Sequence, residues 1–165
     1  MKQTVKKLSI GLITVLFGFL GFNVKAQDVT TDLKLDSDLT EKLVIKSGAN
    51  VTLDLNGHNI TTTNTDAIYV ELGATLTVKG DGVVTSIGKD YASLFNNGVV
   101  TLNGGTFTKD ESKGAWYSIL NHNTITVNDG VTISQTNYVT SSLVDNGYSS
   151  YSSSTNERIG YVSAV

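Results

Sequence analysis

The sequence contains neither cysteine nor proline. Without cysteine, the chain has no disulfide bridge, no cysteine-based zinc site, no cysteine nucleophile and no lipid anchor on cysteine. Charged side chains are also scarce, at 16% of 165 residues. Glycine, threonine, serine, asparagine and valine dominate instead. This composition is typical of a protein rich in β-strands and tight turns, and the length fits one domain.

Basic residues become few after the first 25 positions. Removing the four lysines that lie there from the twelve basic residues leaves eight, against fifteen acidic residues, which is a net charge of −7. Arg158 is the only arginine. A chain of this sign repels phosphate backbones, so we do not expect a nucleic-acid partner.

The N-terminus has the order of a secretory signal. Three lysines precede an apolar run at residues 8–22, and Val24-Lys25-Ala26 places small residues at the two positions that a signal peptidase reads. We therefore predict a signal peptide over residues 1–26, cleavage after Ala26 and a secreted or cell-surface protein. A retained anchor and a buried core helix are the alternatives, but the run is slightly short for a membrane span. No later stretch is apolar enough to cross a membrane.

The rest of the chain is an internal repeat with a period of 24–25 residues. One apolar position recurs at Ile45, Val70, Phe95, Leu120 and Val144, and three residues later stand Gly48, Gly73, Gly98, Asn123 and Gly147. A second strand in each copy carries Leu53, Leu76, Val100 and Ile125, and a third carries Ile60, Val84, Phe107 and Ile133. Apolar and polar residues alternate in these strands, so each strand buries one face.

Three strands per repeat indicate a solenoid, because a unit this small cannot bury its apolar face alone. A propeller blade needs more residues, and the signatures of leucine-rich repeats are absent. We predict a right-handed, single-stranded parallel β-helix of about four to five coils over residues 43–147. Residues 27–42 are expected to form an N-terminal cap, as an irregular strand or a short helix. Residues 148–165 are expected to be a polar tail or the start of further coils.

The segments Leu53-Asp54-Leu55-Asn56-Gly57-His58-Asn59-Ile60 and Ala74-Thr75-Leu76-Thr77-Val78-Lys79-Gly80 carry a family resemblance. They resemble the coils of secreted bacterial right-handed parallel β-helix proteins, of the pectate-lyase-like class, with repeats of the adhesin or surface-protein type. The resemblance covers about residues 43–147. It implies the fold more than an activity, because the class includes lyases, hydrolases, adhesins and phage fibres.

Catalytic residues are not evident. Asn64-Thr65-Asp66 resembles one motif of the polygalacturonases of this fold, but the second acidic pair is missing, and Arg158-Ile159-Gly160 lacks the lysine of their basic element. No group of carboxylates falls on adjacent coils, as a calcium-dependent lyase would need. His58 and His122 lie at different corners of the predicted coil. We expect no enzyme activity, no cofactor and no metal site.

Two sets of side chains are candidates for interaction. Aromatic residues near one corner of successive coils are candidate ligand-binding residues, or alternatively a cover for the loops; they are Tyr69, Tyr91, Trp116, Tyr117 and Tyr138. The residue before each inward position forms a predicted outward apolar stripe at Val44, Tyr69, Leu94, Ile119 and Leu143. The C-terminal tail, a second copy packed side by side or a partner protein would cover this stripe.

Two further columns have structural readings. Asn96, Asn97, Asn121 and Asn146 gather at one corner, where we expect an asparagine ladder along the rod. Outward threonines on the second strand form rows that resemble the face of ice-binding β-solenoids. In the predicted alignment Asp54 and Val99 interrupt these rows, and threonine is favoured on exposed strands in any case.

The sequence thus predicts a non-catalytic, adhesin-like interaction module, extracellular or on the cell surface, that binds a glycan or a protein. The alternatives are a fragment of a polysaccharide lyase or glycoside hydrolase whose catalytic coils are missing, and a purely structural stalk.

Overall fold

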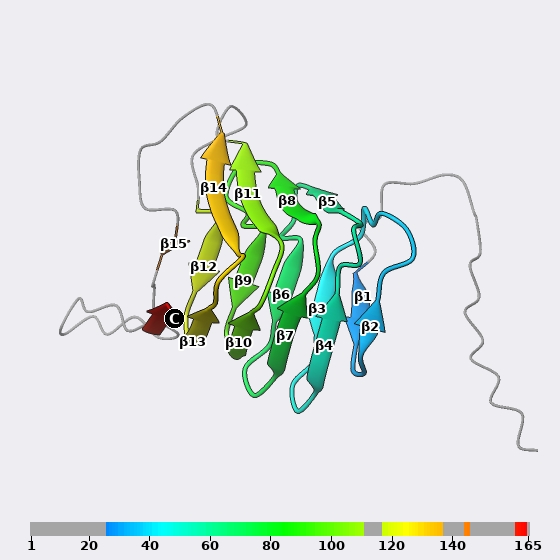
Figure 1. Ribbon diagram of the computed structural model, residues 1–165, viewed down its shortest axis with the longest axis vertical. Helices are drawn as coiled ribbons and strands as arrows, with labels where there is room; N and C mark the ends of the chain where they lie inside the picture. Colours follow the sequence, from blue (N-terminus) through cyan, green and yellow to red (C-terminus); the bar gives the residue numbers. More distant parts are fainter. Residues whose placement is uncertain (1–25, 111–116, 137–143, 146–160, 165) are drawn as a thin grey trace, which may run out of the picture.

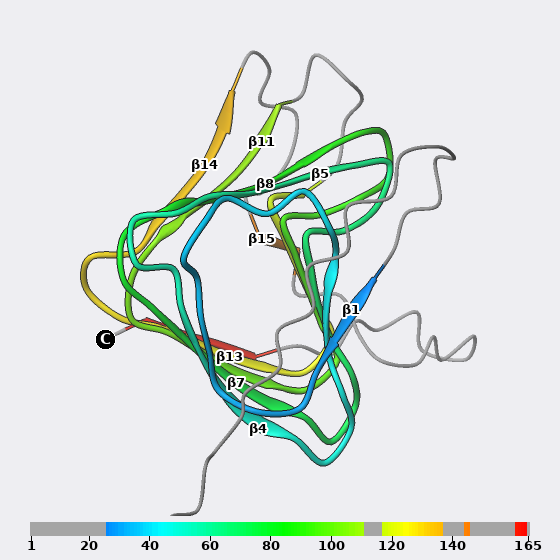
Figure 2. The same cartoon turned by 90° about the vertical axis from the view of Figure 1, so that its right-hand side faces the viewer.

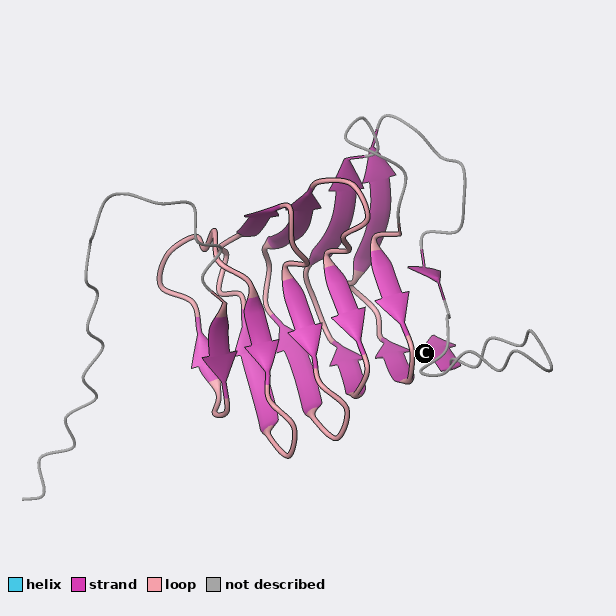
Figure 3. Cartoon of the chain, turned by 180° about the vertical axis from the view of Figure 1, so that it is seen from behind, coloured by secondary structure: helices cyan, strands magenta, loops and turns pink. Residues whose placement is uncertain are grey.

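The computed structural model describes residues 26–110, 117–136, 144–145 and 161–164 (Figure 1). All regular elements in this part are β-strands, and Figure 3 shows no helix among them. The strands are β1 (Gln27–Val29), β2 (Leu33–Lys34), β3 (Leu43–Ile45), β4 (Asn50–Asp54), β5 (Ile60–Thr63), β6 (Ile68–Val70), β7 (Thr75–Lys79), β8 (Val83–Ile87), β9 (Leu94–Asn96), β10 (Val99–Leu102), β11 (Thr106–Asp110), β12 (Ile119–Asn121), β13 (Thr124–Val127), β14 (Thr132–Thr136), β15 (Val144–Asp145) and β16 (Tyr161–Ala164).

The strands form three parallel sheets that wrap around one core (Figure 2). Sheet A has the order β1-β3-β6-β9-β12-β15, sheet B has β16-β13-β10-β7-β4-β2, and sheet C has β14-β11-β8-β5. The chain passes from sheet A to B to C and returns to sheet A one strand further along. From β3 to β12 it completes about three turns, and β13 and β14 follow. The predicted parallel solenoid is therefore confirmed, with fewer described turns than the four to five expected.

The interior is a stack of apolar columns. In sheet A, Leu43, Ile68, Leu94 and Ile119 pair in one register column, and each is fully buried. Burial alternates along β4 and β7, as the period of two in their sequences predicts. No single coil could close this core, so the strands of each coil depend on their neighbours.

Residues 27–42 extend the solenoid rather than cover it with a separate structure. Strand β1 pairs with β3, and β2 pairs with β4, both in parallel. Leu39 forms an isolated bridge with Ile60 at the edge of sheet C. The segment is thus an incomplete first coil, in the irregular-strand form of the two forms expected. At the other end β16 pairs with β13 and adds a strand to sheet B.

The predicted inward column of sheet A is wrong from the third copy onward. Ile45 does pair with Val70, but Val70 pairs with Asn96, and Asn96 pairs with Asn121. Phe95 and Leu120 instead continue the outward column that begins with Val44 and Tyr69. Val144 pairs with Ile119, in the inward column that contains Leu94.

Two compensating length changes cause this error. Six residues, 88–93, connect β8 to β9, whereas four, 64–67, connect the equivalent β5 to β6. Two residues, 97–98, then connect β9 to β10, whereas four, 71–74, connect β6 to β7. Strand β9 is therefore displaced along the sequence relative to a strict 25-residue count, while β10 returns to it. A repeat read at constant spacing misses such a displacement.

Sheets B and C test the other two predicted columns. In sheet B, Val51 rather than Leu53 pairs with Leu76, and Leu53 pairs with Val78. The predicted alignment is thus two residues out in the first copy. In sheet C, the predicted column Ile60, Val84, Phe107 and Ile133 is confirmed at every position.

The recurring glycines occupy two different kinds of turn. Gly48 and Gly73 have φ values of 79° and 83°, in the left-handed region that favours glycine. Gly98 lies instead in the shortened corner, where an added Cβ would stand 2.4 Å from the carbonyl oxygen of Ala74. Its requirement is therefore for space and not for a left-handed φ.

Asparagine side chains satisfy the polar groups at this shortened corner. The side-chain amide of Asn96 donates to Asn121 Oδ1 at 2.7 Å, and Asn96 Oδ1 accepts from the Gly98 backbone at 2.8 Å. Both side chains are fully buried. The expected ladder is confirmed for this pair. Asn97 belongs to a different contact, with Tyr69, and Asn146 lies outside the described residues.

Candidate functional site

Three rings gather on the outer face of sheet A, and we call them the aromatic cluster: Tyr69 on β6, Phe95 on β9 and His122 directly after β12. The Tyr69 and Phe95 rings meet edge to face, with centroids 5.2 Å apart, and the Phe95 and His122 rings do the same at 4.8 Å. Such geometry is favourable between aromatic rings. All three side chains are half-buried. The rings are therefore held in place and still reach the surface.

Polar groups hold the Tyr69 side chain from two sides. The Lys42 ammonium lies 4.6 Å from the centroid of the Tyr69 ring and 3.4 Å from Asp66 Oδ2. The side-chain amide of Asn97 donates to the Tyr69 hydroxyl at 2.9 Å. A cation over the ring and a hydrogen bond at its hydroxyl fix the orientation of this side chain.

An ion pair lies on the same face, next to the aromatic cluster. Lys46 donates to the Glu71 carboxylate, which also accepts the Ser47 backbone N–H at 2.8 Å. The Lys46 hydrogen bond, followed by that of Ser47, lowers the pKa of Glu71. The hydrogen bond to Glu71 in turn raises the pKa of Lys46. Both side chains are therefore charged at neutral pH.

The structure places the predicted ligand-binding residues only in part. Tyr69 lies in the aromatic cluster, and Tyr91 and Tyr117 are half-buried in the connections that precede β9 and β12. Trp116 and Tyr138 lie outside the described residues. Sequence reasoning missed Phe95, which it placed in the core, and treated His122 as an ordinary turn residue. Counting the residues of each corner separately would have found Phe95.

The predicted outward apolar stripe is wrong at two of its positions. Leu94 and Ile119 point into the core and are fully buried. The outward column consists instead of Val44, Tyr69, Phe95 and Leu120. Val44 and Leu120 are only 9% and 8% exposed, so the surface part of this column is the rings. Leu143 lies outside the described residues.

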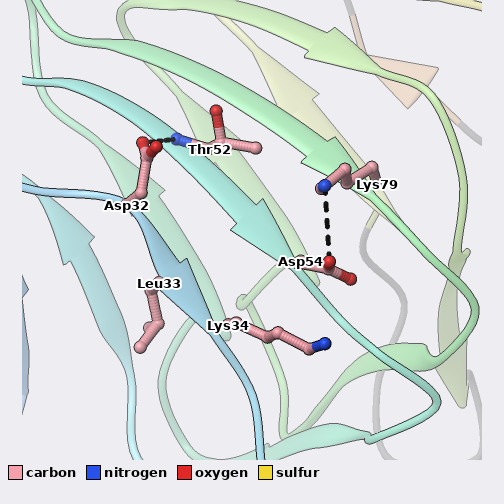
Figure 4. A pocket seen from close by; sticks show the side chains of 6 residues that line it. All are labelled: Asp32, Leu33, Lys34, Thr52, Asp54 and Lys79. Carbon is pink, nitrogen blue, oxygen red and sulfur yellow. Dashed lines mark hydrogen bonds and ion pairs between the residues drawn. The ribbon is translucent and has the colours of Figure 1, made fainter.

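A shallow pocket of about 260 Å³ opens on the outer face of sheet B, at its β2 end (Figure 4). Asp32 Oδ1 accepts the Thr52 backbone N–H at 2.7 Å, and Asp54 Oδ2 lies 3.4 Å from the Lys79 ammonium. Lys34 reaches the same space without forming an ion pair. The pocket carries charges of both signs and no ring.

The residues of the polygalacturonase-like tripeptide have structural contacts. Asp66 is 9% exposed, and its Oδ1 accepts the Ala92 backbone N–H at 2.9 Å while its Oδ2 faces Lys42. Asn64 has a φ of 56° and occupies a turn. Both carboxylate oxygens of Asp66 thus contribute to joining adjacent coils.

The two histidines have different surroundings. His58 Nδ1 lies 3.5 Å from Asp38 Oδ1, and that carboxylate also accepts the Asn59 backbone N–H at 2.9 Å. The Asn59 hydrogen bond is the main cause that lowers the pKa of Asp38. His122 contacts Phe95 on sheet A. Among the described residues, no three histidine or acidic side chains come close enough to hold a metal ion.

Comparison with known proteins gives no relatives. No family model, no curated protein and no solved structure matches this chain. The parallel solenoid is therefore established by the structure alone, and membership of the pectate-lyase-like class stays a prediction. Within the described ranges, no helix is long and apolar enough to span a membrane.

Proposed function

We propose that this chain is a non-catalytic, adhesin-like module, exported from the cell, that binds a glycan through the outer face of sheet A. The aromatic cluster is the observation that carries this proposal. Tyr69, Phe95 and His122 form a continuous line of rings across three successive coils. Rings on a rigid sheet offer apolar area at a low cost in conformational entropy, and the C–H faces of sugar rings pack on such surfaces.

The polar groups around the cluster suit a sugar better than a purely apolar partner. Asn97, Lys42 and Glu71 place amide, ammonium and carboxylate groups beside the rings. Sugar hydroxyls donate to and accept from such groups, while the rings contact the apolar side of the sugar. Coils repeat at about 4.8 Å, which is close to the length of one sugar unit in an extended glycan. A glycan that runs along the rod would therefore meet each coil in a similar way.

Titration calorimetry tests the glycan proposal. The full chain is titrated with hexasaccharides of β-1,4-linked glucose, N-acetylglucosamine and xylose, and of α-1,4-linked galacturonate. We expect one of these to bind, and we expect Phe95→Ala to weaken that binding at least tenfold, since an aromatic contact of this kind is a typical hot spot. Thr85→Ala, on sheet C, is the matched control and leaves the affinity unchanged.

Two results count against the proposal. Failure of the wild type to bind any of the four hexasaccharides removes the glycan, and equal affinity of wild type and Phe95→Ala removes sheet A as the site. New reducing or unsaturated ends in the incubated galacturonate, lost in Asp66→Ala, would show an enzyme instead.

Export is tested separately by the N-terminus of the protein. Strand β1 begins at Gln27, directly after the proposed cleavage site, and the Gln27 backbone N–H donates to the Lys42 carbonyl at 2.8 Å. We expect N-terminal sequencing of material from the culture medium or the cell surface to start at Gln27. Material that starts at Met1 contradicts cleavage.

A further inference from the structure

The outer face of sheet B carries an unbroken column of threonines. Thr52, Thr77, Thr101 and Thr126 pair in register on four adjacent strands, β4, β7, β10 and β13. Two residues earlier on the same strands, a second column contains Asn50, Thr75, Val99 and Thr124. We call these eight positions the threonine array. None of the eight is charged.

The observed register makes this array more regular than the sequence alignment indicates. Asp54 pairs with Lys79 and lies one row beyond the array. The alignment from sequence set Asp54 beside Thr77 because it was two residues out. With the register corrected, one column is wholly threonine, and only Asn50 and Val99 depart from threonine in the other.

The hydroxyls of the first column have no protein partner. In the described part of the chain, Thr52, Thr77 and Thr101 form no side-chain hydrogen bond, and the same is true of Thr126. By contrast, the buried hydroxyls of Thr62 and Ser86 both donate to the Thr65 carbonyl. The array therefore presents hydroxyl and methyl groups that only water or a ligand can contact.

The array is also fixed in space. Threonine is stiff at χ1 because it is branched at Cβ. Seen along the rod, β4, β7 and β13 lie nearly over one another, whereas β11 and β14 splay away from β5 and β8 (Figure 2). Sheet B is thus the flatter of the two threonine-bearing faces. Sheet C has a similar column, at Thr61, Thr85, Thr108 and Ser134, but on a splayed sheet.

We propose that the threonine array of sheet B binds ice. Hydroxyls repeat at about 4.8 Å along the rod and about 6.6 Å across it, and both repeats are close to spacings between water oxygens on faces of hexagonal ice. The hydroxyls can hydrogen-bond to lattice water, and the methyl groups fill the spaces between them. Because the side chains and strands are already ordered, little conformational entropy is lost on binding. The lack of charge matters too, since a charged group would order water in a pattern incompatible with the lattice.

Ice binding is measured on the full chain by three assays. They are the gap between the melting and freezing temperatures of a single crystal, the shape of that crystal, and the partition of the protein into a growing ice hemisphere. We expect faceted crystals, a measurable gap and enrichment in ice relative to serum albumin. The double variant Thr77→Lys/Thr101→Lys should abolish all three, because it places two long charged side chains in the centre of the array.

A matched control separates the array from a general effect of added charge. Thr61→Lys/Thr85→Lys makes the same change on sheet C and should leave all three readouts unchanged. If the sheet B lysine variant fails to fold, as judged by far-ultraviolet circular dichroism, Thr77→Ser/Thr101→Ser replaces it. The serine variant keeps the hydroxyls but loses the methyl groups, and it should reduce the freezing gap.

Three outcomes overturn the proposal: wild-type protein that neither shapes ice nor enters it, a folded sheet B variant that keeps full activity, or equal losses in the sheet B and sheet C lysine variants. Phe95→Ala, which tests the glycan site on sheet A, should leave ice binding intact. Failure of one proposal is therefore distinguishable from failure of the other.

Discussion

Leu94 and Phe95 are adjacent, and the two possible registers of sheet A exchange their places. In the structure Leu94 is fully buried between Ile68 and Ile119, and Phe95 is half-buried on the outer face. A strict 25-residue repeat would bury Phe95 and expose Leu94. Alanine substitution at each position therefore decides which register is present.

The expected magnitudes differ enough to be measured. Leu94→Ala removes three buried carbons, worth about 2.4 kcal/mol at about 0.8 kcal/mol per methylene. A cavity term is added because paired strands relax little, which gives about 3–4 kcal/mol in total. Phe95→Ala loses a half-buried ring and its edge contacts with Tyr69 and His122. At about 0.5–1.5 kcal/mol per aromatic pair and a similar sum for the lost area, the expected cost is about 1.5–2.5 kcal/mol.

Urea unfolding followed by circular dichroism gives both values, from the shift in midpoint at constant slope. Leu72→Ala is the control, since Leu72 is 67% exposed and should cost less than about 0.5 kcal/mol. If Phe95→Ala proves more destabilising than Leu94→Ala by about 1 kcal/mol or more, the observed register is wrong. A change in slope instead would show that the coils do not unfold together.

Three further changes test the corners and the ion pair. Asn121→Ala leaves a buried amide without its acceptor, and urea unfolding should show a loss of about 1–3 kcal/mol, whereas Asn128→Ala, in an exposed amide pair, should cost under about 0.5 kcal/mol. Gly98→Ala places a Cβ 2.4 Å from a backbone oxygen, so the melting temperature should fall by several degrees; an unchanged value would show that the corner is loose. The pKa of Glu71 is lowered by its lysine partner, so its contribution to stability is present above the ordinary glutamate pKa and is lost as the pH falls through the lowered value. Glu71→Gln should therefore be less stable than wild type at neutral pH, and the two should converge on acidification.

The sequence predicted best where connections keep a constant length. The sheet C column, from Ile60 to Ile133, is correct because the strands of that sheet are found at nearly even spacing. Sheet A failed at Phe95, where the lengths of two corners changed together. Periodicity reports the faces of strands but not the lengths of the turns between them.

Lys109 shows a second limit of sequence reasoning. It pairs with Ser86 in sheet C and is fully buried, with its ammonium 2.5 Å from the Gly88 carbonyl oxygen. Hydropathy assigns lysine to the surface, because burial of an ammonium is costly without partners. The alternation of β11 nevertheless places Lys109 inside, on the same side as Phe107. Here strand geometry decides the position of the side chain, and the backbone of the longer connection at residues 88–93 supplies a hydrogen-bond acceptor.

The two changed corners are mechanically linked. Each coil must meet the one before it on three sheets, and a shift of one residue in any sheet would turn its apolar side chains outward. The two residues gained at 88–93 displace β9, and the two lost at 97–98 return β10 to the register of β7. Neither change alone would keep sheet B aligned without a bulge. Compensation at the ends of a single strand thus lets sheet A exchange a core residue for a surface ring, Phe95, while the threonine array on the next sheet stays regular.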